Sequence, residues 1–321
     1  KEKIMANSHF IQYINVISDR STISADFLFE IEEIKPLIAQ IDEVLNSQEA
    51  LNPRNLPYFS TTINKNEMYF KVQGIVFADK SFEVLIANIT QPEKRRLLKQ
   101  QLTSNIAHEL KTPLASIKGY LETLKNNLEV PVEKRAYFIE RAFVQSTRLE
   151  LLLNDISLLN NIEDAGNLFE FKKLKLRPLI NEVVENLNSR ILDNKIKLKI
   201  TIDTAVAVYG NESLVSSVFQ NLIENSINYA GKAVTIEIKQ YLEDEKFYYF
   251  SYSDSGVGIS EVHLQRIFER FYRADEGRAR EQGGTGLGLS IVKNAIQLHK
   301  GEISARNKPG GGLEFLFSLG K

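Results

Sequence analysis

The chain has no cysteine among its 321 residues. That absence excludes disulfide bridges, thiolate zinc sites and cysteine nucleophiles, and it is consistent with a reducing cytoplasm. An excess of charge is also missing, because 40 basic residues face 41 acidic ones and the formal net charge is -1. Such a balance does not indicate a polyanion-binding protein, so nucleic acid is not an expected partner.

Long apolar runs are absent as well. None approaches the roughly 18 to 20 residues that a bilayer-spanning helix needs. No signal peptide is recognisable, and the first residue is Lys1 rather than methionine. We therefore expect the chain to be a piece of a longer protein, with any membrane anchor lying upstream.

The composition fits a soluble globular protein, with 43% hydrophobic and 25% charged residues. The length suffices for two or three domains that each bury a core of their own. The periodicity of apolar residues changes twice along the chain. This pattern predicts domains at residues 1–91, 92–163 and 164–321.

The first region mixes helical and strand patterns. Apolar spacing predicts helices near residues 10–17 and 37–45. Alternating apolar residues then predict strands at residues 68–77 and 82–89, which the short polar tip 78–81 joins as a hairpin. We expect a small α+β domain here.

Residues 92–163 are predicted to be helical almost throughout, with apolar side chains at the spacings of a coiled coil. The repeating residues of the first helix are Leu98, Leu102, Ile106, Leu110, Leu114, Ile117, Leu121, Leu124 and Leu128. Val130 and Pro131 interrupt the pattern, and a second helix resumes from Ile139 to Leu159. The antiparallel hairpin so formed has more apolar surface than one partner covers. A dimeric four-helix bundle would bury it, so we expect a homodimer, with a monomeric hairpin packed on its neighbours as the alternative.

After a linker near residues 160–167, helical and strand patterns mix again. Helices are predicted at residues 179–192, 214–229 and 287–299. Strands are predicted at residues 197–202, 234–240, 247–253, 302–305 and 313–319. Such a mixture predicts a two-layer α/β sandwich.

The stretch HELKTPL, which begins at His108, lies on the first long helix. At about 100° of rotation per residue, His108 is about 200° from both Ile106 and Leu110. It therefore faces water while those residues face the apolar seam. Glu109 and Thr112 are expected to project from the same exposed patch.

These residue types suit phosphoryl chemistry. A histidine ring is largely neutral near pH 7, and a neighbouring carboxylate such as Glu109 can accept the N–H of one ring nitrogen. The lone pair of the other nitrogen is then free to attack phosphorus. Pro113 cannot donate a hydrogen bond to the Glu109 carbonyl, so the helix is expected to loosen there. A solvated surface histidine is the alternative, against which the adjacent acid, threonine and proline weigh.

A later helical stretch places Asn221, Asn225 and Tyr229 on one face, at steps of four. Amide oxygens suit a hard cation such as Mg²⁺, and amide nitrogens suit phosphate. Asparagines that are merely solvated are the alternative.

The stretch YSDSGVGI, which begins at Tyr252, leaves a strand and turns on Gly256 and Gly258. Asp254 can accept a hydrogen bond from an exocyclic amine, and the glycines let the backbone pass close to a ring. An ordinary turn after a strand is the alternative.

The stretch IFERFYR at residues 267–273 precedes a charged run at 274–283 that has no apolar anchor and is predicted to be a mobile lid. The stretch GTGLGLS, which begins at Gly284, then opens an apolar helix. Its glycines expose backbone N–H groups at the positive end of the helix dipole, which forms a cradle for phosphate. Arg270 or Arg273 is placed to neutralise charge on a transferring phosphoryl group.

In this order the five stretches resemble the H, N, first glycine, F and second glycine boxes of the sensor histidine kinases. The resemblance runs from residue 92 to the end, about two-thirds of the chain. It implies that His108 accepts a phosphoryl group and that Glu109 activates it. It also implies that Thr112 positions water when the response regulator is dephosphorylated.

The same resemblance implies that the last domain binds ATP and Mg²⁺ in the manner of the wider superfamily of two-layer sandwich ATPases. Asn225 would ligate Mg²⁺, and Asp254 would read the adenine amino group. The implied nucleotide-binding residues are Asn221, Asn225, Tyr229, Asp254, Gly256, Gly258, Arg270, Arg273, Gly284, Thr285, Gly286, Leu287 and Gly288. The family commonly has a basic residue where this chain has Asn228, so one phosphate contact is missing or comes from elsewhere.

The first domain resembles a PAS domain, because its last strand closes on Ala87-Asn-Ile-Thr90 and runs straight into a helix. Asn88 replaces the aspartate that many PAS domains carry in this closing motif. A ligand-free module for dimerisation and signal relay and a cofactor-binding sensor both fit this domain.

The sequence thus predicts a multidomain α+β protein, the cytoplasmic portion of an inner-membrane sensor histidine kinase. It would phosphorylate His108 from Mg·ATP, pass the phosphoryl group to an aspartate in the receiver domain of a response regulator, and also act as a phosphatase of that regulator. The alternatives are an ATPase of the same superfamily that does mechanical work and a catalytically weak scaffold that only binds partners.

Overall fold

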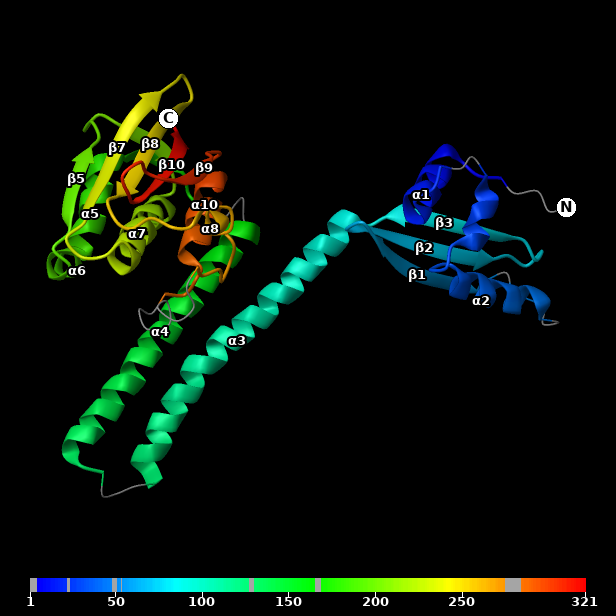
Figure 1. Cartoon of the computed structure of the whole chain (residues 1–321), viewed down its shortest axis with the longest axis horizontal. Coiled ribbons are helices and arrows are strands. Elements are labelled where there is room, and N and C mark those ends of the chain that lie inside the picture. The colour runs from blue at the N-terminus through cyan, green and yellow to red at the C-terminus, as the bar shows by residue number, and fades with distance from the viewer. Residues whose placement is uncertain are drawn as a thin grey trace. The chain divides into compact units, whose positions relative to one another are not determined.

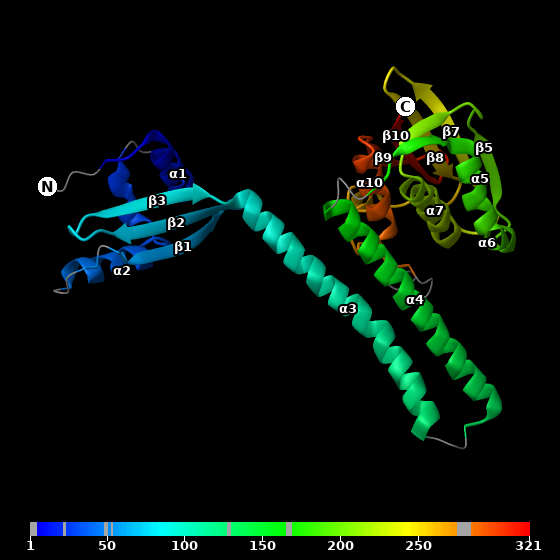
Figure 2. The ribbon, with the colours of Figure 1, turned by 180° about the vertical axis from the view of Figure 1, so that it is seen from behind.

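A computed structural model describes residues 5–21, 24–47, 51–52, 54–126, 130–164, 169–274 and 284–321. The chain forms two compact units, Lys1–Ser104 and Asn105–Lys321. Figure 1 and, from behind, Figure 2 show the elements of each unit. Helix α3 (Thr90–Asn126) begins in the first unit and continues into the second.

The first unit is a three-stranded antiparallel sheet in the order β1-β2-β3 with helices on it. Its strands are β1 (Tyr58–Lys65), β2 (Met68–Val76) and β3 (Phe82–Asn88). Its helices are α1 (Ser8–Ser18), the 3₁₀ helix η1 (Ala25–Glu30) and α2 (Lys35–Asn46). The predicted hairpin is confirmed, since β2 and β3 pair directly. The resemblance to a PAS domain stays a prediction.

Close packing joins α2 to the middle of this sheet. A β-carbon added at Gly74 on β2 would lie 2.6 Å from Cδ1 of Ile41 and 3.2 Å from Cδ2 of Leu37, so the helix rests directly on the strand. Strand β1 was not predicted, because Ile63 is its one fully buried residue and serine and threonine take the place of apolar residues. Its pairing with β2 outweighs the weak apolar alternation.

The second unit begins with the predicted helical hairpin, formed by α3 and α4 (Val132–Asp164). Figure 1 shows the two helices running side by side in opposite directions. The predicted loosening at Pro113 does not interrupt α3, which continues through the buried proline as one helix. Many large apolar side chains of the two helices remain exposed. They are Leu97, Leu98, Leu114, Leu121, Val132, Tyr137, Ile139, Phe143, Val144, Leu151 and Leu153.

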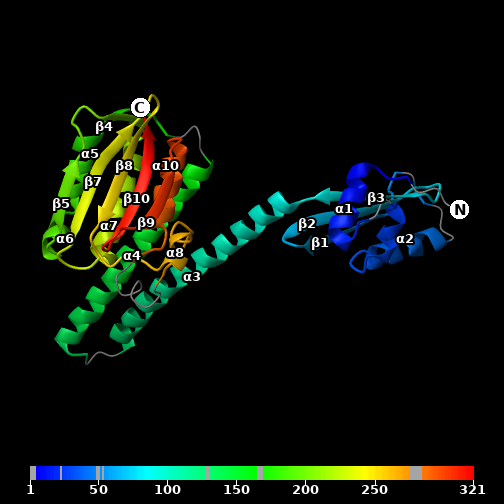
Figure 3. The same cartoon turned by 45° about the horizontal axis from the view of Figure 1, so that its top comes forward.

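The remainder of this unit is a two-layer α/β sandwich, as predicted. Its sheet has the order β5-β7-β8-β10-β9, in which β5 and β7 pair in parallel and the other neighbours are antiparallel. The strands are β5 (Lys197–Thr201), β7 (Thr235–Glu243), β8 (Phe247–Asp254), β10 (Leu313–Gly320) and β9 (Ile303–Asn307). Figure 3 shows this sheet in front of the helices α5 (Leu176–Asn186), α7 (Glu212–Tyr229) and α10 (Gly288–Leu298).

The core of the sandwich lies between the sheet and these helices. Phe219 of α7, Phe250 of β8 and Phe317 of β10 are buried there with rings in contact, the centroids of Phe250 and Phe317 lying 5.5 Å apart. Because α7 and α10 pack on each other in this layer, the asparagine face of one helix meets the glycine-rich start of the other.

Several short elements escaped prediction. The helix expected at residues 179–192 is two helices, because Leu187 leaves helical geometry between α5 and α6 (Asn188–Asp193). Strands β4 (Lys172–Lys175) and β6 (Ala207–Gly210) form a small separate sheet, and α8 (Glu261–Leu264) follows β8. Within the described ranges, no helix combines the length and the apolar character that crossing a bilayer requires.

Candidate active site

His108 lies on the exposed surface of α3, as its position in the helix predicts. Thr112, one turn further on, is also exposed, and its Oγ1 donates a hydrogen bond to the His108 carbonyl oxygen at 3.2 Å. Among the described residues, the imidazole ring has no hydrogen-bond partner. The ring is therefore open to an incoming group.

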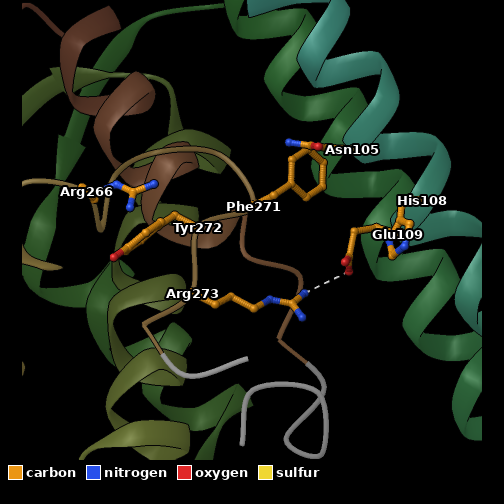
Figure 4. Close-up of a pocket in the computed structure, with 7 residues that line it drawn as sticks. All are labelled: Asn105, His108, Glu109, Arg266, Phe271, Tyr272 and Arg273. Carbon is orange, nitrogen blue, oxygen red and sulfur yellow. Dashed lines mark hydrogen bonds and ion pairs between the residues drawn. The ribbon is translucent and has the colours of Figure 1, made fainter. Parts of the chain in front are cut away.

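Glu109 is less exposed than His108, and its carboxylate is ion-paired. Its Oε2 accepts a hydrogen bond from Nη2 of Arg273 at 3.1 Å and lies 3.9 Å from Nη2 of Arg148 on α4. Figure 4 shows Arg273 reaching toward Glu109 from the loop that follows Phe271. His108 and Glu109 line one cavity, in which two guanidinium groups attract the carboxylate, and the expected role of Glu109 stays a prediction.

A cavity of about 470 Å³ opens beside the histidine. Its lining residues are Asn105, His108, Glu109, Arg266, Phe271, Tyr272 and Arg273 (Figure 4). Arg273 is the most enclosed cation there, with a side chain 9% exposed, and Nη2 also donates to the Gly284 carbonyl oxygen at 2.7 Å. Its Nε is buried and has no hydrogen-bond partner in the described part of the chain. The cavity thus brings the exposed imidazole of His108 and the buried guanidinium of Arg273 into one space.

The predicted asparagine face lies along α7. Nδ2 of Asn221 donates to the carbonyl oxygen of Ser217 at 2.8 Å, which fixes the amide so that Oδ1 faces α10. Asn225 is half-buried, and its side chain makes no hydrogen bond within the described residues. The ring of Tyr229 is partly enclosed, and this burial raises the pKa of its hydroxyl. One held amide and one available amide therefore lie on the same helix face.

The second glycine stretch packs against this face. A β-carbon added at Gly288 would collide with Oδ1 of Asn221, and one added at Gly284 would lie 2.6 Å from the Tyr229 hydroxyl. Gly286 has a φ of +75°, which glycine adopts without strain, and a β-carbon there would lie 2.9 Å from Cα of Phe271. Segments that are far apart in the sequence therefore meet, as the predicted nucleotide site requires.

Asp254 ends β8 as a buried carboxylate, 4% exposed. Its Oδ1 accepts hydrogen bonds from the backbone N–H groups of Gly256 at 2.9 Å and Leu313 at 3.3 Å. Its Oδ2 accepts from the Ser226 hydroxyl at 3.1 Å. A β-carbon added at Gly256 would lie 2.5 Å from the Ala230 carbonyl oxygen, so glycine lets the loop pass close to the end of α7. The loop and α7 together hold this carboxylate in one orientation.

The start of α10 is shaped by Thr285 and Leu287. Oγ1 of Thr285 accepts a hydrogen bond from the Leu287 N–H at 3.2 Å and donates one to Oδ2 of Asp155 at 2.8 Å. The Leu287 side chain is fully buried with Ile291, Leu152 and other apolar residues. Its contribution to a nucleotide site is therefore confined to the backbone, because the side chain is core.

The remaining predicted residues lie around these two loops. Gly258 has a φ of +71° and approaches Asn307 of β9. Arg270 is half-buried and directly precedes Phe271, which lines the cavity. Arg266 lies over the Tyr272 ring, 4.2 Å from its centroid. The predicted lid at 274–283 lies outside the described residues except for its first member, Ala274.

Two features of the site were not predicted. Asp155 occupies a position in the apolar seam of α4, three residues after Leu152 and four before Leu159, and that break in the pattern was the available signal. Arg190 of α6 donates from Nη2 to Oδ1 of Asn228 at 3.0 Å. The guanidinium of Arg190 thus contacts Asn228, the position of α7 at which the family commonly has a basic residue.

The family comparisons match the two parts of this unit. Residues 98–165 match the His Kinase A (phospho-acceptor) domain, and residues 210–321 match the Histidine kinase-, DNA gyrase B-, and HSP90-like ATPase. A helical hairpin with an exposed histidine, followed by this sandwich, defines a histidine kinase core. The chain belongs to the sensor histidine kinases.

Named relatives agree with this assignment. The chain is 34% identical over 257 residues to the phosphate regulon sensor protein PhoR of Haemophilus influenzae, a match that covers 80% of this chain and 59% of the relative. It is 30% identical over 240 residues to PhoR of Pseudomonas aeruginosa, covering 75% and 54%. The chain thus spans somewhat more than half the length of these curated relatives.

A solved structure supports the fold over most of the chain. The crystal structure of histidine kinase ThkA in complex with response regulator protein TrrA superposes with a TM-score of 0.58 at 22% identity. The match covers 94% of this chain and 86% of that one. At this identity the likeness establishes the shared fold.

Proposed function

We propose that this chain transfers the γ-phosphoryl group of Mg·ATP to His108 and then passes it to an aspartate in the receiver domain of a response regulator. One observation carries the proposal, the presence of two complementary features in a single compact unit. An exposed imidazole lies on α3, and a glycine-lined loop opens α10 against the asparagine face of α7. The first is an acceptor, and the second is shaped to hold the donor.

The residues of the loop and of α7 fit an adenine nucleotide with Mg²⁺. Asp254 presents a carboxylate that only accepts hydrogen bonds, which matches the exocyclic amine of adenine. The half-buried amide of Asn225 offers an oxygen to a hard cation. The backbone N–H groups at the start of α10 suit phosphate. Bound Mg²⁺ would supply positive charge beside the phosphates.

The transfer forms a bond between a ring nitrogen of His108 and the γ-phosphorus. It breaks the bond between that phosphorus and the oxygen that leaves with ADP. The attacking nitrogen must carry no proton, and the N–H on the other ring nitrogen becomes more acidic as the ring gains positive charge. Once Glu109 is released from Arg273, its carboxylate accepts that proton. Positioning and neutralisation of charge provide most of the rate, as in phosphoryl transfer generally.

The hairpin supports the proposed partners. Its exposed apolar side chains, such as Ile139 and Phe143, fit a second copy of the hairpin in a four-helix bundle. His108 and Thr112 are exposed together, so a receiver domain can reach both. Thr112 would then position water when the chain acts as a phosphatase of its regulator. Use of ATP and a response regulator would place this part of the protein on the cytoplasmic side of an inner membrane.

The experiment that tests the proposal is labelling with γ-labelled ATP. The wild-type chain should take up acid-labile label, and His108→Ala should take up none while it binds Mg·ADP with unchanged affinity. His9→Ala is the matched control, because His9 is exposed in the first unit and should leave labelling intact. Undiminished labelling of His108→Ala contradicts the proposal, and an ATPase that does mechanical work would hydrolyse ATP without labelling the protein.

A further inference from the structure

A half-buried carboxylate from the helical hairpin contacts the loop that is proposed to hold phosphate. Oδ2 of Asp155, on α4, accepts a hydrogen bond of 2.8 Å from Oγ1 of Thr285. The same Oγ1 accepts from the N–H of Leu287, the residue that caps α10. Asp155 is thus one hydrogen bond removed from the start of that helix.

The surroundings of Asp155 are apolar. Leu152 and Leu159, on the same side of α4, pack against Leu287 and Ile291 of α10 in one buried cluster. Burial raises the pKa of the Asp155 carboxyl, and the nearby carboxylate of Glu224 raises it further. In the part of the chain that the structure describes, no lysine or arginine forms an ion pair with Asp155. The carboxylate therefore lies in a place that disfavours its charge.

The N-terminal end of α10 offsets the negative charge of this carboxylate. The first turn of a helix has backbone N–H groups without partners and a partial positive charge, which attract an anion. Asp155 contacts this end through Thr285, in the loop whose Gly284 and Gly288 pack directly against Tyr229 and Asn221 of α7. A nucleotide phosphate would be attracted by the same partial charge. Two anions placed there repel each other across a poorly solvated space.

We propose that Asp155 is an internal anionic competitor of the nucleotide phosphates, so that docking of the glycine loop on α4 and tight nucleotide binding oppose each other. The inference rests on the proposed nucleotide site and goes beyond it by naming a residue outside that site that regulates it. When nucleotide binds, the Thr285–Asp155 hydrogen bond breaks and the loop is released from α4. When nucleotide leaves, Asp155 again neutralises the start of α10.

The test measures binding of a non-hydrolysable ATP analogue with Mg²⁺ by calorimetry. Asp155→Asn retains an oxygen that accepts from Thr285 but removes the charge. We expect it to bind the analogue about tenfold more tightly than the wild type, which is about 1.4 kcal/mol. Binding of AMP, which lacks the β- and γ-phosphates, should change much less. Glu150→Gln, a loss of charge at an exposed position of the same helix, should leave both affinities unchanged.

A second variant separates repulsion from a structural role. Asp155→Ala removes both the charge and the hydrogen bond, so it should also tighten binding of the analogue. If Asp155 only held the loop in shape, Asp155→Asn would be silent and Asp155→Ala would weaken binding of the analogue and of AMP alike, which would overturn the inference. Unfolding temperatures are recorded for each variant, and Asp155→Ser replaces Asp155→Asn if that variant does not fold.

The outcome also distinguishes this inference from the proposed function. A wild-type chain that binds neither the analogue nor ADP overturns both. A wild-type chain that binds the analogue with the same affinity as Asp155→Asn overturns the competitor role alone and leaves the nucleotide site in place.

Discussion

Replacing Asp254 by asparagine should change the base preference of the nucleotide site without unfolding the sandwich. The carboxylate accepts two backbone N–H groups on Oδ1, at 2.9 and 3.3 Å, and the Ser226 hydroxyl on Oδ2 at 3.1 Å. Asparagine keeps one oxygen for the two N–H groups, and the hydroxyl can rotate to accept from the new NH₂ group. We therefore expect the free energy of unfolding to fall by only about 1 kcal/mol.

The affinity for adenine should change by more. A hydrogen bond to a charged group contributes roughly 1.5–3 kcal/mol. In Asp254→Asn the NH₂ group would face the adenine amine donor to donor, so Mg·ADP should bind about 10- to 150-fold more weakly. Hypoxanthine carries a carbonyl oxygen where adenine carries the amine. Inosine diphosphate should therefore gain affinity from the same substitution.

Calorimetric titration of the wild type and Asp254→Asn with Mg·ADP and with magnesium inosine diphosphate measures both changes. Asp193→Asn is the matched control, because Asp193 is an exposed acid at the end of α6. Urea unfolding of each variant separates loss of affinity from loss of fold. If both nucleotides lose affinity by the same factor, Asp254 holds the loop without reading the base, and the reasoning is refuted.

Three further predictions concern stability. His299 is buried, and its Nε2 accepts a hydrogen bond from the Asn211 N–H at 3.0 Å. Burial lowers the pKa of the imidazole. The stability that is present above the unfolded pKa of about 6.5 is therefore lost as the pH falls. Urea unfolding should show a loss of up to about 1 kcal/mol between pH 6.5 and 5.5 that His299→Gln removes; equal slopes would contradict this. Gly312→Ala should cost about 2–4 kcal/mol, because φ is +96° and the β-carbon would strike a backbone carbonyl oxygen of β8. Gly119→Ala, where no atom lies within 4 Å of the added β-carbon, should instead stabilise α3 by roughly 0.5–1 kcal/mol in the same assay.

Periodicity and glycine placement predicted most of this architecture, because each reports a local property. The spacing of apolar residues fixes which face of α7 is core, and Asn221 and Asn225 lie on the flank of that face. Gly284 and Gly288 of the second glycine stretch lie where β-carbons would collide with α7, so glycine at these positions reflects close packing of the loop on that helix. The two-layer sandwich followed from the alternation of such helices with apolar strands.

The relations between distant segments could not be predicted in the same way. Nothing in the local pattern of α3 indicates that Glu109 pairs with Arg273, which lies far along the chain, or that Arg148 of α4 approaches it. The contact between Arg190 and Asn228 likewise depends on how α6 packs beside α7. Such contacts depend on packing between elements, and the residue periodicity of one element does not indicate which element packs against it.

The ion pairs of Glu109 compete with the proton-accepting role that we propose for this carboxylate. Oε2 of Glu109 accepts from Nη2 of Arg273 at 3.1 Å and lies 3.9 Å from Nη2 of Arg148, so two guanidinium groups stabilise the charge of this carboxylate. Nη2 of Arg273 also binds the Gly284 carbonyl oxygen at 2.7 Å, which ties the same guanidinium to the glycine loop. Movement of the Arg273 side chain would therefore both free Glu109 and change the shape of the glycine loop. Since Asp155 holds the other side of that loop, nucleotide binding and activation of His108 can be linked through the release of the loop from the hairpin.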